Sequence, residues 1–97
     1  MARNQKLTGV IQGRTIADMH QEDGKLAIHF MDGSTMTVKI AGQAPADGVG
    51  GTIKAVRQKG TTLNLDLVDG RTLSLQTVEP TASVMVRDKN HTLEYAD

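Results

Sequence analysis

The sequence contains no cysteine and no tryptophan, and its aromatic residues are limited to one phenylalanine and one tyrosine. Without cysteine the chain has no disulfide framework, no thiolate nucleophile and no zinc site built on sulfur ligands. Two aromatic residues are too few for the stacking platforms of single-strand nucleic-acid binders. The core must therefore be aliphatic, and a cytoplasmic location fits the lack of cysteine.

An excess of charge of one sign is also missing, because 11 Lys and Arg residues balance 11 Asp and Glu residues. A generic DNA or RNA binder normally carries a basic excess that neutralises phosphates. No segment approaches the roughly 18 apolar residues of a membrane span, and residues 1–13 lack the apolar run of a secretory signal. We expect a cytoplasmic protein without membrane contact, for which nucleic acid is not the favoured partner.

An internal repeat is the most informative feature that is present. A shift of 37 residues aligns residues 14–40 with residues 51–77 without a gap. Apolar positions align with apolar ones, as Phe30 does with Leu67, and the Asp-Gly pair at 32–33 recurs at 69–70. We predict a duplication, joined by a glycine-rich loop at residues 41–51 that serves as a connector or as a flap.

Each repeat has the pattern of three short strands in a meander. Apolar and polar residues alternate over residues 26–30 and 36–40, and again over 63–67 and 73–76, as in half-buried strands. A three-residue loop at Asp32-Gly33 pairs Ile28 with Met36, which places the apolar side chains of both strands on one face. We therefore predict that Gly33 and its counterpart Gly70 adopt the left-handed conformation.

Two isoleucines do not follow this alternation. If the strands are regular, Ile16 and Ile53 fall on the outer face of their meanders. A bulge near Ala17-Asp18 and Lys54-Ala55 would turn the isoleucines into the core instead, whereas regular strands would leave an apolar strip for the terminal hairpin or another chain to cover. We favour the core.

These patterns define the expected fold class. We predict one all-β domain over residues 1–97, a small barrel or sandwich built from two duplicated three-stranded meanders plus a C-terminal hairpin at 82–96. Residues 7–11 are expected to form a first strand, and no helix is expected. The short meanders and Asp-Gly turns are similar to those of SH3-like barrels, a resemblance of architecture that carries no function.

One group of polar residues on the outer face is a candidate site. With a two-residue turn after Glu22, Asp18 lies opposite His29 and diagonal to His20, which is the composition of a metal or acid–base site. The equivalent residues of the second repeat are Ala55, Arg57 and Asp66, which suggest a salt bridge. An ordinary solvated polar cluster is the favoured interpretation. We therefore assign no catalytic, cofactor or metal residue and keep five candidate binding residues, Asp18, His20, His29, Arg57 and Asp66.

The favoured function is a binding or interaction module without catalytic activity or cofactor, whose partner is another protein or a further copy of the chain. One alternative is a nucleic-acid-associated small barrel, for which a local basic patch would be needed. The basic residues near the repeat turns are Arg14, Lys54, Arg57, Lys59 and Arg71. A second alternative is a small enzyme or metal-binding protein with its site at Asp18, His20 and His29.

Overall fold

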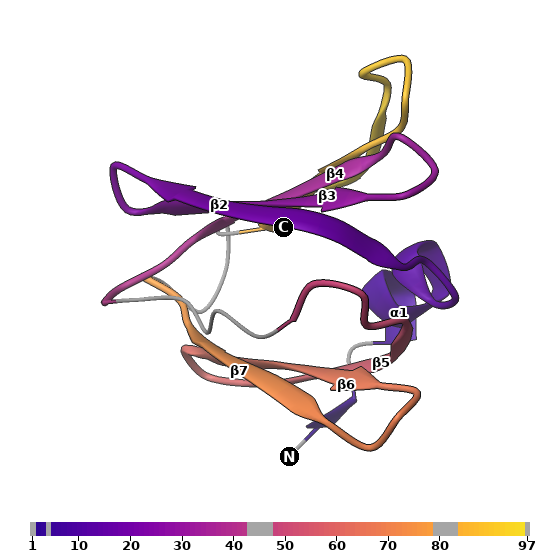
Figure 1. Cartoon of the computed structure of the whole chain (residues 1–97). Helices are drawn as coiled ribbons and strands as arrows, with labels where there is room; N and C mark the ends of the chain where they lie inside the picture. The colour runs from indigo at the N-terminus through magenta and orange to yellow at the C-terminus, as the bar shows by residue number, and fades with distance from the viewer. Residues whose placement is uncertain (1, 4, 43–47, 79–83, 97) are drawn as a thin grey trace.

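The computed structural model describes residues 2–3, 5–42, 48–78 and 84–96, which form nine strands and one helix (Figure 1). The helix, α1, spans Gln5–Ile11. The strands are β1 (Ala2–Arg3), β2 (Ile16–Glu22), β3 (Lys25–Phe30), β4 (Thr35–Lys39), β5 (Ile53–Lys59), β6 (Thr62–Leu67), β7 (Thr72–Gln76), β8 (Val84–Arg87) and β9 (Leu93–Ala96). In this part of the chain no helix is long and apolar enough to cross a membrane.

The strands form two antiparallel sheets that face each other (Figure 1). The first sheet has the order β2-β3-β4-β8-β9, and the second has the order β1-β5-β6-β7. The all-β prediction is confirmed, and the described strands do not close into a barrel. We call β2–β4 the first meander and β5–β7 the second meander. The hairpin of β8 and β9 extends the first sheet beyond β4, while residues 82 and 83 of the predicted hairpin lie outside the described residues.

The Asp-Gly turns set the register of both meanders as predicted. The Phe30 N–H donates to the Ser34 carbonyl at 2.9 Å, and Ile28 lies opposite Met36. The backbone φ angle is 90° at Gly33 and 95° at Gly70. Glycine adopts this left-handed conformation at little cost because it has no Cβ. The apolar side chains of the paired strands consequently point to one side of each sheet.

A bulge follows the first residue of β2 and of β5. The register shifts between Ile16 and Asp18, and in the same way between Ile53 and Ala55. One extra residue re-aims the side chains on either side of it, so the isoleucine and the strand that follows can both present apolar groups inward. Both isoleucines are completely buried, which confirms that they belong to the core.

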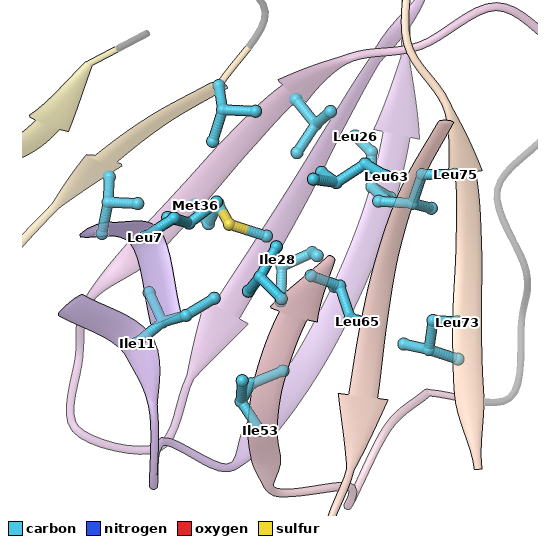
Figure 2. Close-up of a cluster of buried hydrophobic side chains, with 14 of the residues drawn as sticks. Leu7, Ile11, Leu26, Ile28, Met36, Ile53, Leu63, Leu65, Leu73 and Leu75 are labelled. Carbon is cyan, nitrogen blue, oxygen red and sulfur yellow. The ribbon is translucent and has the colours of Figure 1, made fainter. Parts of the chain in front are cut away.

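The core is a layer of aliphatic side chains between the two sheets (Figure 2). The β3 row from the first meander faces the β6 row from the second, and each row comes from alternate positions of its strand. Phe30 and Tyr95 are the two aromatic members of this layer. The β3 and β6 rows are Leu26, Ile28 and Phe30, and Leu63, Leu65 and Leu67.

Residues 7–11 belong to a helix, so the prediction of a first strand there is wrong. A short apolar run does not distinguish a strand from a helix, and the i, i+4 spacing of Leu7 and Ile11 places both on one helical face. Both side chains are completely buried. The Thr8 hydroxyl accepts a hydrogen bond from the Val56 N–H at 2.9 Å and donates to its carbonyl at 3.3 Å. The helix therefore packs on β5 at one side of the core (Figure 1).

Hydrogen bonds between the two meanders keep a spacing of 37 residues. Thr15 forms an isolated bridge with Thr52, and their hydroxyl oxygens lie 2.8 Å apart. The backbone bonds around this bridge come in pairs that are related by a shift of 37 residues. The Ile16 N–H donates to the Gly51 carbonyl, and correspondingly the Ile53 N–H donates to the Arg14 carbonyl. The Gly13 N–H donates to the Ile53 carbonyl, and correspondingly the Gly50 N–H donates to the Ile16 carbonyl.

The described end of the 41–51 loop is packed against the core between β2 and β7. A Cβ added to Gly48 would lie 2.5 Å from Leu73 Cδ1 and 2.8 Å from Met19 Sδ. No side chain fits there unless its neighbours move. Residues 43–47 of this loop, which was predicted to be a connector or a flap, lie outside the described residues.

Candidate functional site

The outer face of the first sheet carries Asp18, His20 and His29. The two-residue turn between Glu22 and Lys25 sets a register in which Asp18 lies directly opposite His29 and His20 lies opposite Ala27. All three polar side chains are exposed. The predicted alignment of Asp18 with His29 is therefore confirmed.

The three side chains do not converge on one point. His29 Nδ1 lies 3.2 Å from the Thr35 hydroxyl, and His20 Nε2 lies 3.2 Å from Glu22 Oε2. Within the described ranges no group of three His, Asp or Glu side chains is arranged to hold a metal ion. A shallow hollow of about 320 Å³ beside His20 is lined by Glu22, Asp23, Lys25, Ala27 and Thr37. Asp18 and His29 take no part in that hollow, so the cluster does not form a shared pocket.

On the second sheet, Arg57 and Asp66 form the salt bridge suggested by the sequence. Arg57 Nε and Nη2 each donate to one carboxylate oxygen of Asp66 at 2.8 Å. The Thr72 hydroxyl donates to the same carboxylate at 2.9 Å. These bonds favour the charged form, and those from Arg57 are the largest reason that the pKa of Asp66 is below its ordinary value. The two side chains are thus engaged with each other within the chain.

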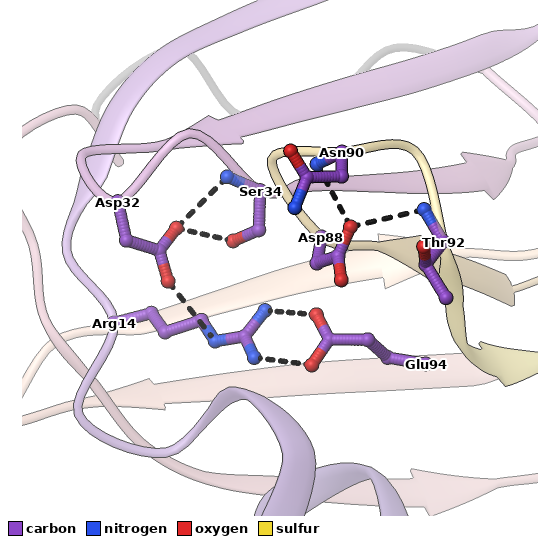
Figure 3. A network of polar contacts seen from close by, with 7 residues as sticks. All are labelled: Arg14, Asp32, Ser34, Asp88, Asn90, Thr92 and Glu94. Atoms are coloured by element: carbon purple, nitrogen blue, oxygen red, sulfur yellow. Dashed lines mark hydrogen bonds and ion pairs between the residues drawn. The ribbon is translucent and has the colours of Figure 1, made fainter.

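A second polar cluster joins the terminal hairpin to the first meander (Figure 3). We call it the Arg14 network, and it consists of Arg14, Asp32, Ser34, Asp88 and Glu94. Arg14 donates one hydrogen bond of 2.9 Å to each carboxylate oxygen of Glu94, and its Nε lies 3.5 Å from Asp32 Oδ2. Asp32 also accepts hydrogen bonds from the N–H and the hydroxyl of Ser34. The guanidinium therefore bridges the turn of one hairpin to a strand of another.

Partial burial strengthens the Arg14 network. The Arg14 side chain is only 17% exposed, and its hydrogen bonds to Glu94 are the main reason that its pKa is raised. The hydrogen bond from the Ser34 hydroxyl is the largest cause of the lowered pKa of Asp32. A hollow of about 270 Å³ beside the network is lined in addition by Lys89 and Asn90. The Arg14 guanidinium is thus neutralised by two carboxylates of the same chain. Because one of them belongs to the hairpin and the other to the first meander, the network holds the hairpin in place.

The sequence interpretation missed this network because its parts are far apart in the chain. Arg14 and Glu94 are 80 residues apart, and no local pattern connects them. The available signal was a difference between the repeats, since the position of Arg14 is occupied by Gly51 in the second copy. That signal marks Arg14 as special but does not reveal its partner.

Charge is divided unevenly between the meanders. Residues 16–39 carry four acidic and two basic residues, a net charge of −2, whereas residues 53–76 carry four basic and two acidic residues, a net charge of +2. Three members of the predicted basic set nevertheless contact carboxylates, and the contacts are Arg14 with Glu94, Arg57 with Asp66 and Arg71 with Asp69. The surface of the second meander is therefore of mixed charge with a modest basic excess.

The strand β7 differs from the other sheet edges. The strands at the edges of the two sheets are β1, β2, β7 and β9. β1 contains Arg3, β2 contains Asp18 and Glu22, and β9 contains Glu94, whereas β7 has no charged residue between Thr72 and Gln76. Charged residues commonly protect an edge strand from pairing with another chain. β7 lacks this protection.

The backbone of β7 presents hydrogen-bonding groups to its open side. The Leu67 N–H donates to the Arg71 carbonyl at 2.8 Å, so in the antiparallel alternation every second residue from 71 onward bonds to β6. The N–H and carbonyl groups of Thr72, Ser74 and Gln76 consequently face away from β6. In agreement, the Gln76 carbonyl accepts a bond from outside the strand pair, from the N–H of residue 41.

The equivalent edge of the first meander is covered. Thr35 and Thr37 on β4 hold the positions of Thr72 and Ser74, and they pair with residues 87 and 85 of β8. At the end of β7 an isolated bridge between Ile40 and Thr77 places residue 41 beside Gln76. Among the described residues no strand pairs with the outer side of β7 at Thr72 and Ser74. Two equivalent strands thus differ in whether their outward backbone groups have a partner strand.

Comparisons with protein families, with curated proteins and with solved structures found no match for this chain.

Proposed function

We propose that this chain is a binding module that takes up an additional β-strand along β7. The observation that carries the proposal is the contrast between β4, which pairs with β8, and β7, which ends its sheet. An extended segment that adds to an open edge gains main-chain hydrogen bonds, which provide affinity, and side-chain contacts on alternate residues, which provide specificity. Thr72 and Ser74 supply the outward backbone groups for such pairing.

The alternation of side chains defines the strand that would fit. Leu73 and Leu75 of β7 point into the core, and the residues between them are exposed. On the first sheet, Val84 and Val86 of β8 are buried while Met85 is exposed. The strand recognised by β7 should therefore alternate β-branched apolar residues with polar ones, as β8 does.

A peptide with the sequence of residues 83–88 is a direct probe, because it contains the strand that covers β4. In an NMR titration we expect saturable shifts of the Thr72 and Ser74 amides, which face the edge, and smaller shifts of the Leu73 and Leu75 amides. This difference between neighbouring residues distinguishes edge pairing from nonspecific contact.

Ser74→Pro is the variant that tests the proposal. Proline removes the outward N–H of Ser74 and leaves the backbone bonds of Leu73 and Leu75 to β6 in place, and proline is tolerated at such edge positions. We expect the peptide shifts at Thr72 to disappear while the far-UV spectrum stays that of the wild type. Equal titration curves for the wild type and Ser74→Pro, or no saturable shift along β7 in the wild type, would refute the proposal.

We further propose that the two meanders are duplicated halves of a β-sandwich of SH3-like character that acts in the cytoplasm. The hydrogen bonds that recur at a spacing of 37 residues support the duplication, and the two facing sheets support the sandwich. The lack of cysteine is compatible with the cytoplasm.

The basic excess of the second meander supports nucleic-acid association as a second candidate. Lys54 and Lys59 are exposed on β5 and add to the arginines of this meander. Phosphate contacts weaken steeply as salt rises. Retention on DNA that falls with salt, and that Lys54→Glu together with Lys59→Glu abolishes, would support this candidate, whereas no retention at low salt would remove it.

A further inference from the structure

We propose that the partner of β7 is a four-residue extended segment of another protein, which runs antiparallel to β7 and begins opposite Leu75; this inference rests on the function proposed above. The contact of residue 41 with Gln76 closes one end of the edge. The pairing of β8 with β4 supplies the direction and the order of side chains, because β4 and β7 are equivalent strands.

Residue 41 determines where the incoming strand begins. The isolated bridge after β7 brings residue 41 beside Gln76, whose carbonyl accepts the N–H of residue 41 at 2.8 Å. A partner residue therefore has no room opposite Gln76. Thr72 and Ser74 present their N–H and carbonyl groups to the open side, and Leu75 is the last residue of β7 that a partner strand can face.

The first meander shows that a strand can pair directly beside such a contact. Residue 78 donates its N–H to the Lys39 carbonyl at 3.1 Å, which is the same contact shifted by 37 residues. β8 nevertheless pairs with residues 35–38 of β4, up to the residue before Lys39. The equivalent residues 72–75 of β7 therefore offer an edge of the same length.

The turn at residues 48–51 does not obstruct this edge. The Gly51 N–H donates to the Gly48 carbonyl as the Arg14 N–H donates to the Ile11 carbonyl, both at 3.1 Å. The chain thus takes the same path in both halves, and in the first half β8 pairs with β4 although the larger Ile11 stands in the place of Gly48.

The register of β8 on β4, transferred to β7, defines the chemistry of the partner. β8 buries its first and third residues and exposes its second and fourth. On β7 the first and third residues of the partner would lie opposite Leu75 and Leu73, which point into the core. The second and fourth would lie opposite Ser74 and Thr72, which are partly or fully exposed to solvent. We infer β-branched apolar residues at the first and third positions and polar residues at the other two.

Met19 gives the inward residues of the partner a further apolar contact. A Cβ at Gly48 would lie 2.8 Å from Met19 Sδ and 2.5 Å from Leu73 Cδ1, so these two side chains are neighbours. Met19 is only half-buried, whereas its counterpart Val56 is completely buried where α1 packs on β5. An apolar residue opposite Leu73 would extend the apolar surface beside Met19.

A second copy of the chain offers no described strand that is both free and suitably patterned. β8 has the required pattern, but it is paired with β4 on one side and with β9 on the other. The edge strands β2 and β9 do not alternate buried and exposed residues. β7 of a second copy would bring its own residue 41 against the edge. The occupant is therefore a segment of another protein.

Paramagnetic labels at the two ends of the probe peptide test the direction. In the bound peptide of residues 83–88 the N-terminus should lie near residue 41 and the C-terminus near Gly70. A nitroxide at the N-terminus should therefore broaden the amide signal of residue 41 more than that of Gly70, and a nitroxide at the C-terminus should do the opposite. A reversed result, or equal broadening by both labels, would overturn the antiparallel alignment.

Charged residues within the peptide test the register. Val86→Asp in the peptide places a carboxylate on the inner face opposite Leu73, where it would lose its hydration. Met85→Asp is the matched control, because this side chain would lie on the exposed face beside Ser74. We expect the first change to raise the dissociation constant by at least about tenfold and the second to raise it less. Equal effects, or a larger effect of Met85→Asp, would overturn the register, since a slip by one residue exchanges the two faces.

The outcomes separate this inference from the proposed function. If the peptide binds along β7 with the reversed direction or with the other face inward, strand uptake stands and only the assigned partner chemistry falls. If the peptide does not bind, or binds Ser74→Pro as it binds the wild type, both proposals fall. The free protein should sediment as a monomer at millimolar concentration, and a dimer that the peptide dissociates would overturn the assignment to another protein.

Discussion

The two meanders have nearly the same backbone and differ in what surrounds them. Both have a bulge at the first strand, a two-residue first turn and a glycine in the left-handed conformation at the second turn. The first meander is extended beyond β4 by the terminal hairpin, whereas the second is extended beyond β5 by the two-residue strand β1. The same frame therefore presents an open, uncharged edge in one half and a covered edge in the other.

The residues that differ between the halves account for this contrast. Arg14 reaches Glu94 on the hairpin, while its counterpart Gly51 is buried without space for a side chain. Ser34 is buried beside Asp32, and its counterpart Arg71 is exposed and pairs with Asp69. The same strand pattern can thus either hold a further hairpin or leave its edge open, depending on a few polar positions at the turns.

Gly51→Val should have the largest effect, because it forces the second meander to carry a side chain where the first has Arg14. A Cβ at Gly51 would lie 2.5 Å from Leu67 Cδ1 and 3.2 Å from the Gly48 carbonyl oxygen. We expect a loss of about 2–3 kcal/mol in the free energy of unfolding, measured by denaturant titration. Arg14→Val is the matched control and should cost less. Equal losses would mean that the two positions do not differ in packing.

Gly33→Val and Gly70→Val should come next and should be unequal. Both substitutions place a β-branched residue at positive φ, which should cost about 1–2 kcal/mol. A Cβ at Gly33 would also lie 2.9 Å from the Cβ of Lys89 in the hairpin turn, whereas at Gly70 it would meet no atom within 4 Å. Thermal unfolding should therefore show the lower midpoint for Gly33→Val.

Lys89→Gly provides the control for this second comparison. It removes the Cβ that approaches Gly33, so the difference in unfolding midpoint between the two valine variants should become smaller when both also carry Lys89→Gly. An unchanged difference in unfolding midpoint, or a Gly70→Val variant that is less stable than Gly33→Val, would show that the hairpin does not press on the Asp32-Gly33 turn.

Arg14→Ala should cost more stability than Arg57→Ala. The Arg14 side chain is 17% exposed and that of Arg57 is 39% exposed, so solvent screens the Arg57 pair more strongly. We expect a loss of about 1 kcal/mol for Arg14→Ala and a smaller loss for Arg57→Ala. Hydrogen exchange of β9 amides should accelerate in Arg14→Ala alone, and unchanged exchange there would contradict its role in fastening the hairpin.

The smallest expected effect is a change in the dependence of stability on pH. The pKa of Asp32 is below its ordinary value of 3.8, chiefly because of the Ser34 hydroxyl. A carboxyl whose pKa is lower in the folded state stabilises the fold fully above the unfolded pKa and loses that contribution as the pH falls through the folded value. The unfolding free energy should thus decline below about pH 4, and less steeply in Asp32→Asn. Parallel curves would exclude a contribution from Asp32.

Much of each meander could be predicted from the sequence, because alternation and turn residues act locally. The pairing of Ile28 with Met36 follows from the Asp-Gly turn and the need to bury one face. The inward position of Ile16 follows from its apolar side chain, which favours a bulge over exposure. The helix at Gln5–Ile11 could not be predicted in this way, since five apolar and small residues fit a strand as well as one helical turn.

Less of the candidate site could be predicted from the sequence. The alignment of Asp18 with His29 could be predicted because neighbouring strands determine it. The separate partners of His20 and His29 could not, because they depend on side-chain positions. The pairing of β8 with β4 likewise depends on contacts between distant segments, and neither alternation nor turn residues specify which edge a terminal hairpin will join.

Amide hydrogen exchange at Thr37 and Ser74, measured without and with the peptide of residues 83–88, compares the covered and the open edge within one molecule. These equivalent residues both turn their N–H groups away from the meander, toward β8 in one case and toward the open edge in the other. Thr37 should be protected in both samples, whereas Ser74 should exchange rapidly in the free protein and become protected as the peptide is added. Equal protection of the two amides in the free protein would contradict the open edge, and rapid exchange of Ser74 at saturating peptide would contradict strand uptake.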